Sequence, residues 1–104
     1  MTPKELQSQL KSKKPPLVLD VRSGMEYRMG HIPGALHLPL WKLLFRLTGP
    51  LPADRSTPLV VVCESGSRSQ LAAELLRKRG YSTINLLAGD MAGWRGAGLA
   101  VESA

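Results

Sequence analysis

The residue best suited to chemistry in this sequence is its single cysteine, Cys63, which ends an apolar run and precedes a polar stretch. The run LVVVC, residues 59–63, predicts a strand that is buried on both faces. Small or polar residues follow it: Glu64, Ser65, Gly66, Ser67, Arg68 and Ser69. Such a loop can curl so that successive backbone N–H groups point inward and bind an anion. Because a helical pattern follows, a helix N-terminus adds its positive dipole end, and the arrangement favours a thiolate nucleophile.

A structural role is the alternative for Cys63, because most lone cysteines are inert, buried side chains. The position at a strand end, before a glycine-containing loop and a helix start, favours the reactive role. Arg68 adds positive charge near the thiol, whereas Glu64 opposes a thiolate if its side chain faces the site.

Helical and strand patterns alternate along the chain, which predicts a mostly parallel α/β sheet flanked by helices. We expect strands at residues 17–21, 35–38, 59–63 and 82–87. We expect helices from Thr2 to about Lys13, from Ser23 onward, over 40–47 and from the cysteine loop to Arg79, with a turn or short helix at 89–98. Ligands bind outside the carboxyl ends of the strands in such sheets, and Cys63 falls at that end of its strand.

Local motifs support these elements. The spacings Thr2–Glu5 and Ser23–Glu26 are those of capping boxes, and Gly80 suits the position after a helix end. The helix at 40–47 is expected to turn Trp41, Leu44 and Phe45 to one side.

Composition limits the classes of protein that fit. A chain of 104 residues with 43% apolar and 21% charged residues is expected to form one globular domain, over residues 1–104. The N-terminus lacks an apolar signal segment, no apolar run approaches membrane-spanning length, and one cysteine needs no oxidising compartment, so we expect a soluble, cytoplasmic protein. The net charge of +6 has two interpretations: it attracts an anionic substrate or partner, or it reflects basic side chains that are simply solvated at the surface. With aromatic residues at 5%, nucleic-acid binding is not expected.

The cysteine loop, CESGSRS, resembles the C-x-S-G-x-R-S active-site loop of single-domain rhodaneses. Two further signatures of that family have similar counterparts in the same order along the chain. The first comprises Asp20-Val21-Arg22, Glu26-Tyr27 and residues 30–35, GHIPGA; the second comprises Gly80-Tyr81, Asn85-Leu86, residues 87–91, LAGDM, and Trp94. Asp90 departs from the pattern, because the family commonly has a second glycine there.

The resemblance implies a rhodanese-like three-layer fold and a sulfurtransferase activity of the thiosulfate sulfurtransferase type. Cys63 would take a sulfane sulfur from thiosulfate or a persulfide donor, hold it as a persulfide, and pass it to a thiol, a protein or, in the assay, cyanide. The family implies no metal and no organic cofactor.

Roles within the site follow from the same resemblance. The amides of residues 64–69 would cradle the persulfide, and Gly66 would permit the tight curl. Arg68 would either orient the anionic donor or brace the loop, and Ser69 is expected to cap the helix rather than bond the sulfur. Asp20, Arg22 and Glu26 are expected to form a hydrogen-bonded brace at the base of the site.

Two other functions compete with sulfur transfer. Phosphatases and arsenate reductases use a C-x5-R loop, whereas Cys63 and Arg68 enclose four residues, which suits a single sulfur better than a phosphate. A non-enzymatic sulfur carrier or regulatory module is the other alternative, because residues 38–51, LPLWKLLFRLTGPL, combine apolar residues with Lys42 and Arg46. That segment is expected to cover the sheet as an amphipathic helix, with a docking surface or a weak membrane contact as the alternatives.

Overall fold

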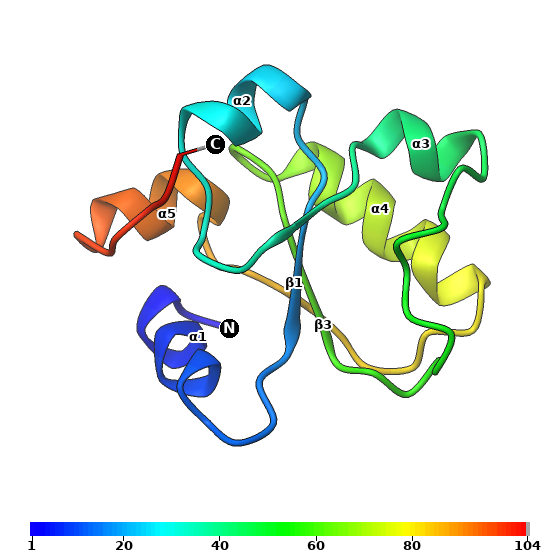
Figure 1. The fold of residues 1–104 in the computed structure, drawn as a ribbon, viewed down its shortest axis with the longest axis horizontal. Helices are drawn as coiled ribbons and strands as arrows, with labels where there is room; N and C mark the ends of the chain where they lie inside the picture. The colour runs from blue at the N-terminus through cyan, green and yellow to red at the C-terminus, as the bar shows by residue number, and fades with distance from the viewer. Residues whose placement is uncertain (104) are drawn as a thin grey trace.

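The structure, a computed structural model that describes residues 1–103, is built on a parallel sheet of four strands (Figure 1). β1 (Leu17–Asp20) lies between β2 (Leu36–His37) and β3 (Leu59–Val62), and β4 (Ile84–Leu86) pairs with β3. Every pairing is parallel. The chain order reverses between β1 and β3, so the carboxyl ends of these two strands form the switch point at which such sheets bind ligands.

Helices connect the strands and cover both faces of the sheet. Within the described residues they are α1 (Pro3–Leu10), α2 (Gly24–Met29), α3 (Leu40–Leu44), α4 (Ser67–Lys78) and α5 (Asp90–Gly96). Figure 1 shows α1 and α5 on one side of the sheet and α3 and α4 on the other. In this part of the chain no helix has the length and apolar character needed to cross a bilayer.

The alternation of side chains along the strands divides the core into two layers. Leu19 and Val61 point into the layer beneath α3 and α4, where they meet Leu43, Ala72 and Leu76. Val18 and Val60 point into the opposite layer, where they meet Leu6 of α1 and Met91 and Trp94 of α5. The period of two in a strand sends neighbouring residues to opposite faces, so both layers come from the same short strands. The predicted three-layer α/β fold is confirmed.

Both predicted capping boxes are present. Thr2 accepts the Glu5 amide while the Glu5 carboxylate accepts the Thr2 amide, and Ser23 and Glu26 are joined in the same way. These boxes begin α1 and α2 by satisfying amides that lack helical partners. α1 ends at Leu10, three residues before the expected Lys13.

α3 ends at Leu44, short of the expected residue 47, and the side that carries Trp41, Leu44 and Phe45 faces solvent and not the sheet. Trp41, Leu44 and Phe45 are 53%, 52% and 72% exposed, and the buried residue of this helix is Leu43. The stretch LWKLLFRL is apolar on several sides, so its periodicity admits more than one buried stripe. The packing of Leu43 against α4 in the core, with Leu40 beside it, determines which one turns inward.

Candidate active site

Cys63 lies at the switch point of the sheet, directly after β3 and 1% exposed. Across from it, residues 21 and 22 continue from β1, and the Val21 amide donates to the Val62 carbonyl. Residues 64–66 form a tight bend, and α4 begins at Ser67. The thiol is thus placed at the carboxyl edge of the sheet and at the N-terminus of a 12-residue helix. The positive end of that helix favours negative charge on the sulfur.

Gly66 and Ser69 contact the sulfur. The Gly66 amide donates to Cys63 Sγ over 3.0 Å, and Sγ lies 3.4 Å from Ser69 Oγ. Gly66 has φ +124°, a conformation that L side chains rarely adopt, and this bend aims its amide at the sulfur. Among the hydrogen bonds of the described residues, Gly66 supplies the one loop amide on Sγ; the cradle expected from residues 64–69 stays a prediction for the persulfide state.

Ser69 does not cap α4, contrary to expectation. It stands at the third position of the helix, where its hydroxyl donates to the Gly66 carbonyl over 3.1 Å and faces the cysteine. The helix has no side-chain cap hydrogen bond, and Gly66 occupies the N-cap position. The first amides of α4 therefore have no competing serine hydroxyl, which leaves them available to an anion. The exposed side chains of Ser65 and Ser67 lie away from the sulfur's contacts.

The start of α5 holds the other side of the cysteine loop. The Asp90 carboxylate accepts the Cys63 amide over 2.9 Å, while the amides of Met91 and Ala92 donate to the carbonyls of Cys63 and Glu64. These bonds satisfy the amide and carbonyl of Cys63 and the carbonyl of Glu64, and they fix this part of the loop against α5. Sequence reasoning missed this role of Asp90. The available signal was its departure from the family glycine, because Asp90 keeps the positive φ, +52°, that favours a glycine.

Asp20 and Arg22 form a buried pair beneath the loop. Arg22 Nη2 lies 2.8 Å from the Asp20 carboxylate, and both side chains are at most 2% exposed. Burial alone would lower the pKa of Arg22, but the bond to Asp20 and the nearby Glu64 carboxylate raise it. The same nitrogen, Nη2, also donates to the Gly30 carbonyl, and Nη1 donates to the Glu64 carboxylate. The arginine thereby connects β1, the end of α2 and the cysteine loop.

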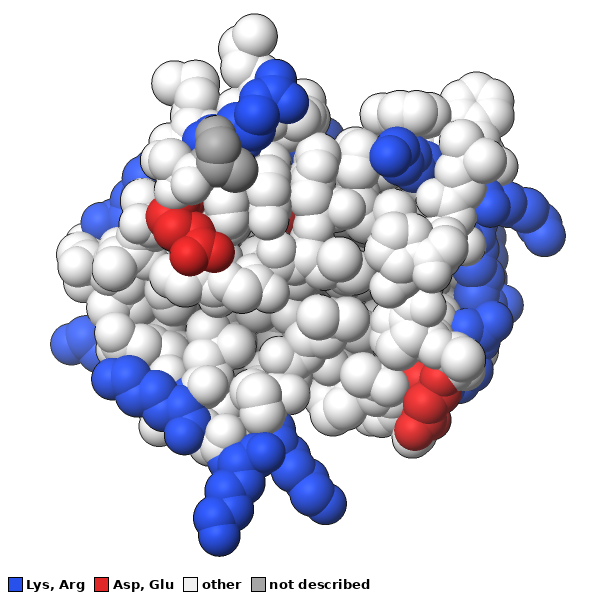
Figure 2. Space-filling model, viewed as in Figure 1, with Lys and Arg blue, Asp and Glu red and all other residues white. Residues whose placement is uncertain are grey.

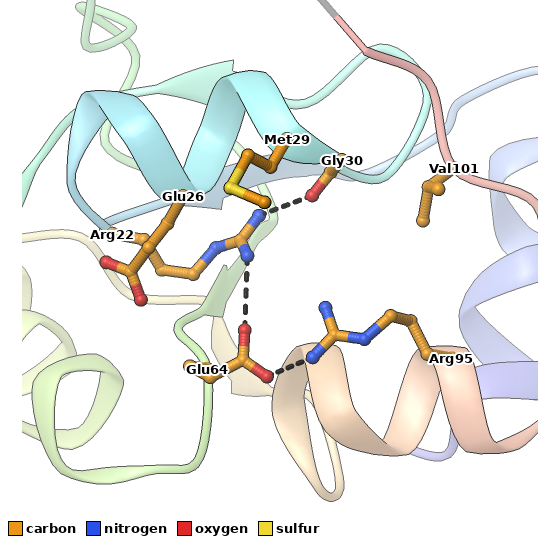
Figure 3. Close-up of a pocket in the computed structure, with 7 residues that line it drawn as sticks. All are labelled: Arg22, Glu26, Met29, Gly30, Glu64, Arg95 and Val101. Carbon is orange, nitrogen blue, oxygen red and sulfur yellow. Dashed lines mark hydrogen bonds and ion pairs between the residues drawn. The ribbon is translucent and has the colours of Figure 1, made fainter.

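Glu64 points away from the sulfur. Its carboxylate lies between Arg22, at 3.2 Å, and Arg95 of α5, as Figure 3 shows. This side chain borders a cavity of about 340 Å³ beside the loop, which is lined by Arg22, Glu26, Met29, Gly30, Glu64, Arg95 and Val101. Cys63 is not among the lining residues, so the cavity flanks the cysteine and does not enclose its sulfur. The opposition to a thiolate expected from Glu64 is reduced, because two arginines balance its charge.

Glu26 pairs with Arg68 and not with Asp20 and Arg22, so the expected brace consists of two separate pairs. Arg68 donates two hydrogen bonds to the Glu26 carboxylate, over 2.7 and 2.9 Å. The bond to Glu26 raises the pKa of Arg68, and the same pair lowers the pKa of Glu26 to about 2. The bidentate geometry ties α2 to the first turn of α4.

The charges of these side chains nearly cancel. Arg22, Arg68 and Arg95 are matched by Asp20, Glu26 and Glu64 in the contacts above, and Asp90 adds a further carboxylate. No lysine, arginine or histidine among the described residues contacts Sγ. Stabilisation of negative charge on the sulfur therefore falls to the Gly66 amide, to the N-terminus of α4 and, without a hydrogen bond, to Arg68, whose pKa is raised mainly by Glu26 and in smaller part by the charge of Cys63.

Residues of the remaining motifs support the backbone. The ring of Tyr27 stacks on His31 and His37, with centroids 3.7 and 4.5 Å away, and its hydroxyl donates to the Ala35 carbonyl. His37 Nε2 lies 2.8 Å from the Arg22 carbonyl oxygen, so this histidine is bonded to the backbone. These contacts hold the chain from α2 to β2 against the carboxyl edge of β1.

Fold and site together define a class: small parallel α/β proteins that hold a cysteine beneath a short loop at a helix N-terminus. The chain matches the rhodanese-like domain over residues 2–97, and it belongs to that family.

Several curated relatives are similar over most of this chain. A sulfurtransferase of Allochromatium vinosum is 35% identical over 82% of this chain and 77% of its own length. The thiosulfate sulfurtransferase GlpE of Pseudomonas paraeruginosa is 36% identical over 75% of this chain and 68% of its own length. The putative sulfur carrier protein YrkF of Bacillus subtilis is 33% identical over 76% of this chain, which spans only 41% of that protein. The family therefore includes proteins named for sulfur transfer and for sulfur carriage.

Solved structures agree with the fold. The Alr3790 protein of Anabaena has a TM-score of 0.88 and 28% identity, over 100% of this chain and 82% of that one. The human single-domain sulfurtransferase TSTD1 has a TM-score of 0.78 and 30% identity, over 92% and 94% of the two chains.

Proposed function

We propose that this protein is a sulfurtransferase that carries sulfur on Cys63 as a persulfide. The observation that supports this most directly is the setting of Sγ, which accepts the Gly66 amide at the N-terminus of α4. A thiolate there needs no general base, and no histidine contacts the sulfur among the described residues. The names of the relatives agree with sulfur transfer as the reaction class.

Thiosulfate is the proposed donor. The Cys63 thiolate attacks the outer sulfur, the S–S bond of thiosulfate breaks, and sulfite leaves with the bonding electron pair. Cys63 then carries the outer sulfur as a persulfide anion, so total charge is conserved. In the second step an acceptor thiolate attacks that sulfur, the new S–S bond breaks, and the Cys63 thiolate is restored. The acceptor is a small thiol or a protein thiol.

Phosphate chemistry is not supported by this geometry. A phosphatase loop directs its arginine at the oxyanion, whereas both Nη atoms of Arg68 are bonded to Glu26. The bidentate pair favours the bracing role for Arg68 over the donor-orienting role. We expect negligible hydrolysis of p-nitrophenyl phosphate.

Mass spectrometry of the intact protein after thiosulfate treatment tests the proposal. We expect an added mass of about 32 Da, removable by dithiothreitol and absent from Cys63→Ser, because one sulfur atom is transferred to that thiol. Ser65→Ala is the matched control, since Ser65 is an exposed loop residue without a contact to Sγ. Unmodified wild-type protein after treatment with thiosulfate and with a persulfide donor would refute the proposal.

A carrier role is the second candidate, favoured by the similarity to a putative sulfur carrier and by the exposed apolar side chains of α3. Turnover distinguishes the two. Repeated transfer to cyanide or small thiols at rates typical of enzymes supports the sulfurtransferase. Single loading followed by slow release to small acceptors supports the carrier.

A further inference from the structure

A group of large apolar side chains protrudes from α3 and the three residues after it. Trp41, Leu44, Phe45 and Leu47 are all more than half exposed, and we call them the α3 apolar group. Isolated exposed apolar residues are ordinary, but four within seven positions form a patch that favours a binding partner. Lys42 lies over the Trp41 ring, 5.6 Å from its centroid, so a cation already borders the group.

The end of α3 puts an arginine where a glycine is expected. The Arg46 amide donates to the Leu43 carbonyl and the Leu47 amide to the Lys42 carbonyl, which together make a Schellman turn. The residue at its C′ position needs a positive φ and is usually glycine, yet Arg46 occupies it with φ +60°. A strained non-glycine residue of this kind suggests that the side chain itself has a use. Here the turn presents a cation beside the α3 apolar group.

A basic groove lies next to that group. Its volume is about 540 Å³, and its lining includes Leu43, Arg46, Arg55, Lys78 and Arg79. No acidic side chain of the described residues lines it, and none of its four cations belongs to an ion pair in that part of the chain. Two acids adjoin lining residues in the sequence: Asp54, which accepts from the Ser56 amide and hydroxyl, and Glu74 of α4, which is exposed and forms no ion pair among the described residues. In Figure 2 basic side chains border the face over α3 and the end of α4.

Two of the groove cations are held in place without being neutralised. Arg55 donates to the Tyr81 hydroxyl over 2.6 Å and stacks on its ring, while Arg79 donates to the Leu43 carbonyl. Their positive charge is therefore presented at the groove, and neither arginine forms an ion pair with a carboxylate of the described residues. An anion is the ligand that this charge complements.

We infer that this surface docks the protein on an anionic phospholipid bilayer, with a headgroup phosphate at the basic groove and the α3 apolar group among the lipid chains. Exposed tryptophan, phenylalanine and leucine flanked by lysine and arginine have the composition of interfacial membrane segments. An acidic protein would complement the charge, but the apolar side chains protrude from a short helix, which suits insertion into a fluid phase better than contact with a rigid surface. The contact is peripheral and independent of the sulfur chemistry.

The two tryptophans make the test direct. Trp41 is 53% exposed and Trp94 is 2% exposed, so a change in emission on binding reports on Trp41. With vesicles of equal phosphatidylglycerol and phosphatidylcholine, we expect a blue shift, protection from acrylamide and co-sedimentation. With phosphatidylcholine alone, we expect at least tenfold weaker binding, because each cation near an anionic surface is worth about fivefold in affinity.

Matched variants locate the contact. Phe45→Ser is expected to weaken vesicle binding roughly tenfold, while Met25→Ser, a similarly exposed residue on α2, is expected to leave it unchanged. Lys78→Gln is expected to weaken binding about fivefold. Lys13→Gln is expected to leave it unchanged, because Lys13 follows α1, and Figure 1 shows α1 on the opposite side of the sheet from α3. Arg46→Gly is expected to weaken binding about fivefold without lowering the urea midpoint, since glycine suits the positive φ.

Three results would overturn the inference. The first is an unchanged Trp41 emission with anionic vesicles, which is the result expected if the surface binds an acidic protein instead. The second is equal binding to neutral and anionic vesicles. The third is an equal loss of vesicle binding in Phe45→Ser and Met25→Ser. Because each variant is compared at a measured urea midpoint, a loss caused by unfolding is recognised separately.

Discussion

Glu26 joins α2 to the cysteine loop, and its replacement by glutamine tests that connection. The carboxylate serves two partners: it accepts the Ser23 amide within a capping box and two hydrogen bonds from Arg68. Glutamine can keep the capping hydrogen bond but loses the charge that holds the guanidinium. Glu26→Gln therefore removes the ion pair while the helix start is preserved.

The size of the effect follows from the ionisation of Glu26. The hydrogen bond from Arg68, with smaller contributions from Ser23, lowers its pKa from 4.5 to about 2 against the opposing effect of burial. A shift of that size corresponds to ~3 kcal/mol in favour of the carboxylate. Because the Arg68 and Glu26 side chains are 36% and 32% exposed, solvent screening reduces the stabilisation to about 1 kcal/mol.

The sign of the pH dependence is set by a folded pKa below the unfolded one. The stabilisation is present in full above pH 4.5 and is lost as the pH falls toward 2, because the unfolded chain takes up the proton first. Urea unfolding should thus show wild type more stable than Glu26→Gln by about 1 kcal/mol at pH 7 and at pH 5.5, and by less at pH 3.

Glu5→Gln is the matched control, since Glu5 has the same place in the capping box of α1 but no arginine partner among the described residues. Hydrogen bonds from Thr2 also lower the pKa of Glu5, so Glu5→Gln reports the pH dependence of a capping box alone, which should be smaller than the difference at Glu26. A wild-type advantage over Glu26→Gln that is constant from pH 7 to pH 3, or an equal effect at Glu5, would refute the reasoning.

Three further predictions concern the backbone of the site, each measured by urea unfolding and by sulfur loading after thiosulfate treatment. Asp90→Ala should cost about 1–3 kcal/mol and lower loading, because the buried Cys63 amide loses its acceptor, whereas Asp90→Asn keeps an acceptor and tolerates the positive φ; equal losses would contradict this. Gly66→Ala should cost roughly 1–3 kcal/mol and reduce loading, since φ +124° strains any side chain; unchanged loading would contradict it. Gly93→Ala should destabilise by ~1–3 kcal/mol, because its Cβ would lie 2.5 Å from the Ala88 carbonyl oxygen, whereas Gly96→Ala, with open space, should stabilise by about 0.5 kcal/mol; the reverse order would contradict it.

Sequence reasoning worked best where the controlling interaction is local. The capping boxes of α1 and α2 each span four residues, and both are present. The run LVVV predicted a doubly buried strand, and all four residues of β3 are buried. Gly80, after the C-cap of α4, has the positive φ expected of a glycine there. Such patterns can be interpreted from the sequence because the partner of each group lies within the same turn or the same strand.

Interactions between segments that are distant in the chain could not be predicted from the sequence. Glu26 and Arg68 are 42 residues apart, and Asp90 and Cys63 are 27 apart, so spacing gives no reason to pair them. Arg22 and Arg68 carry the same charge and both lie in motifs of the expected site. There was therefore no reason in the sequence to prefer Arg68 over Arg22 as the partner of Glu26. For α3 the apolar residues outnumber the buried places, so tertiary packing and not periodicity selected Leu43.

The contacts of the Cys63 sulfur indicate which parts of the motif would govern the proposed sulfur chemistry. Sγ is contacted by one backbone amide and one hydroxyl, while the charged side chains around the loop are bonded to one another. Since those charges nearly cancel, we expect the proposed reactivity of Cys63 to depend chiefly on where the backbone of residues 63–69 points, with Arg68 as a longer-range contribution. Gly66 sets one side of that backbone through its positive φ, and Asp90 sets the other through the Cys63 amide. The exposed side chains of Ser65 and Ser67 take no part in either constraint. Other residue types at these two positions should therefore leave the shape of the loop unchanged.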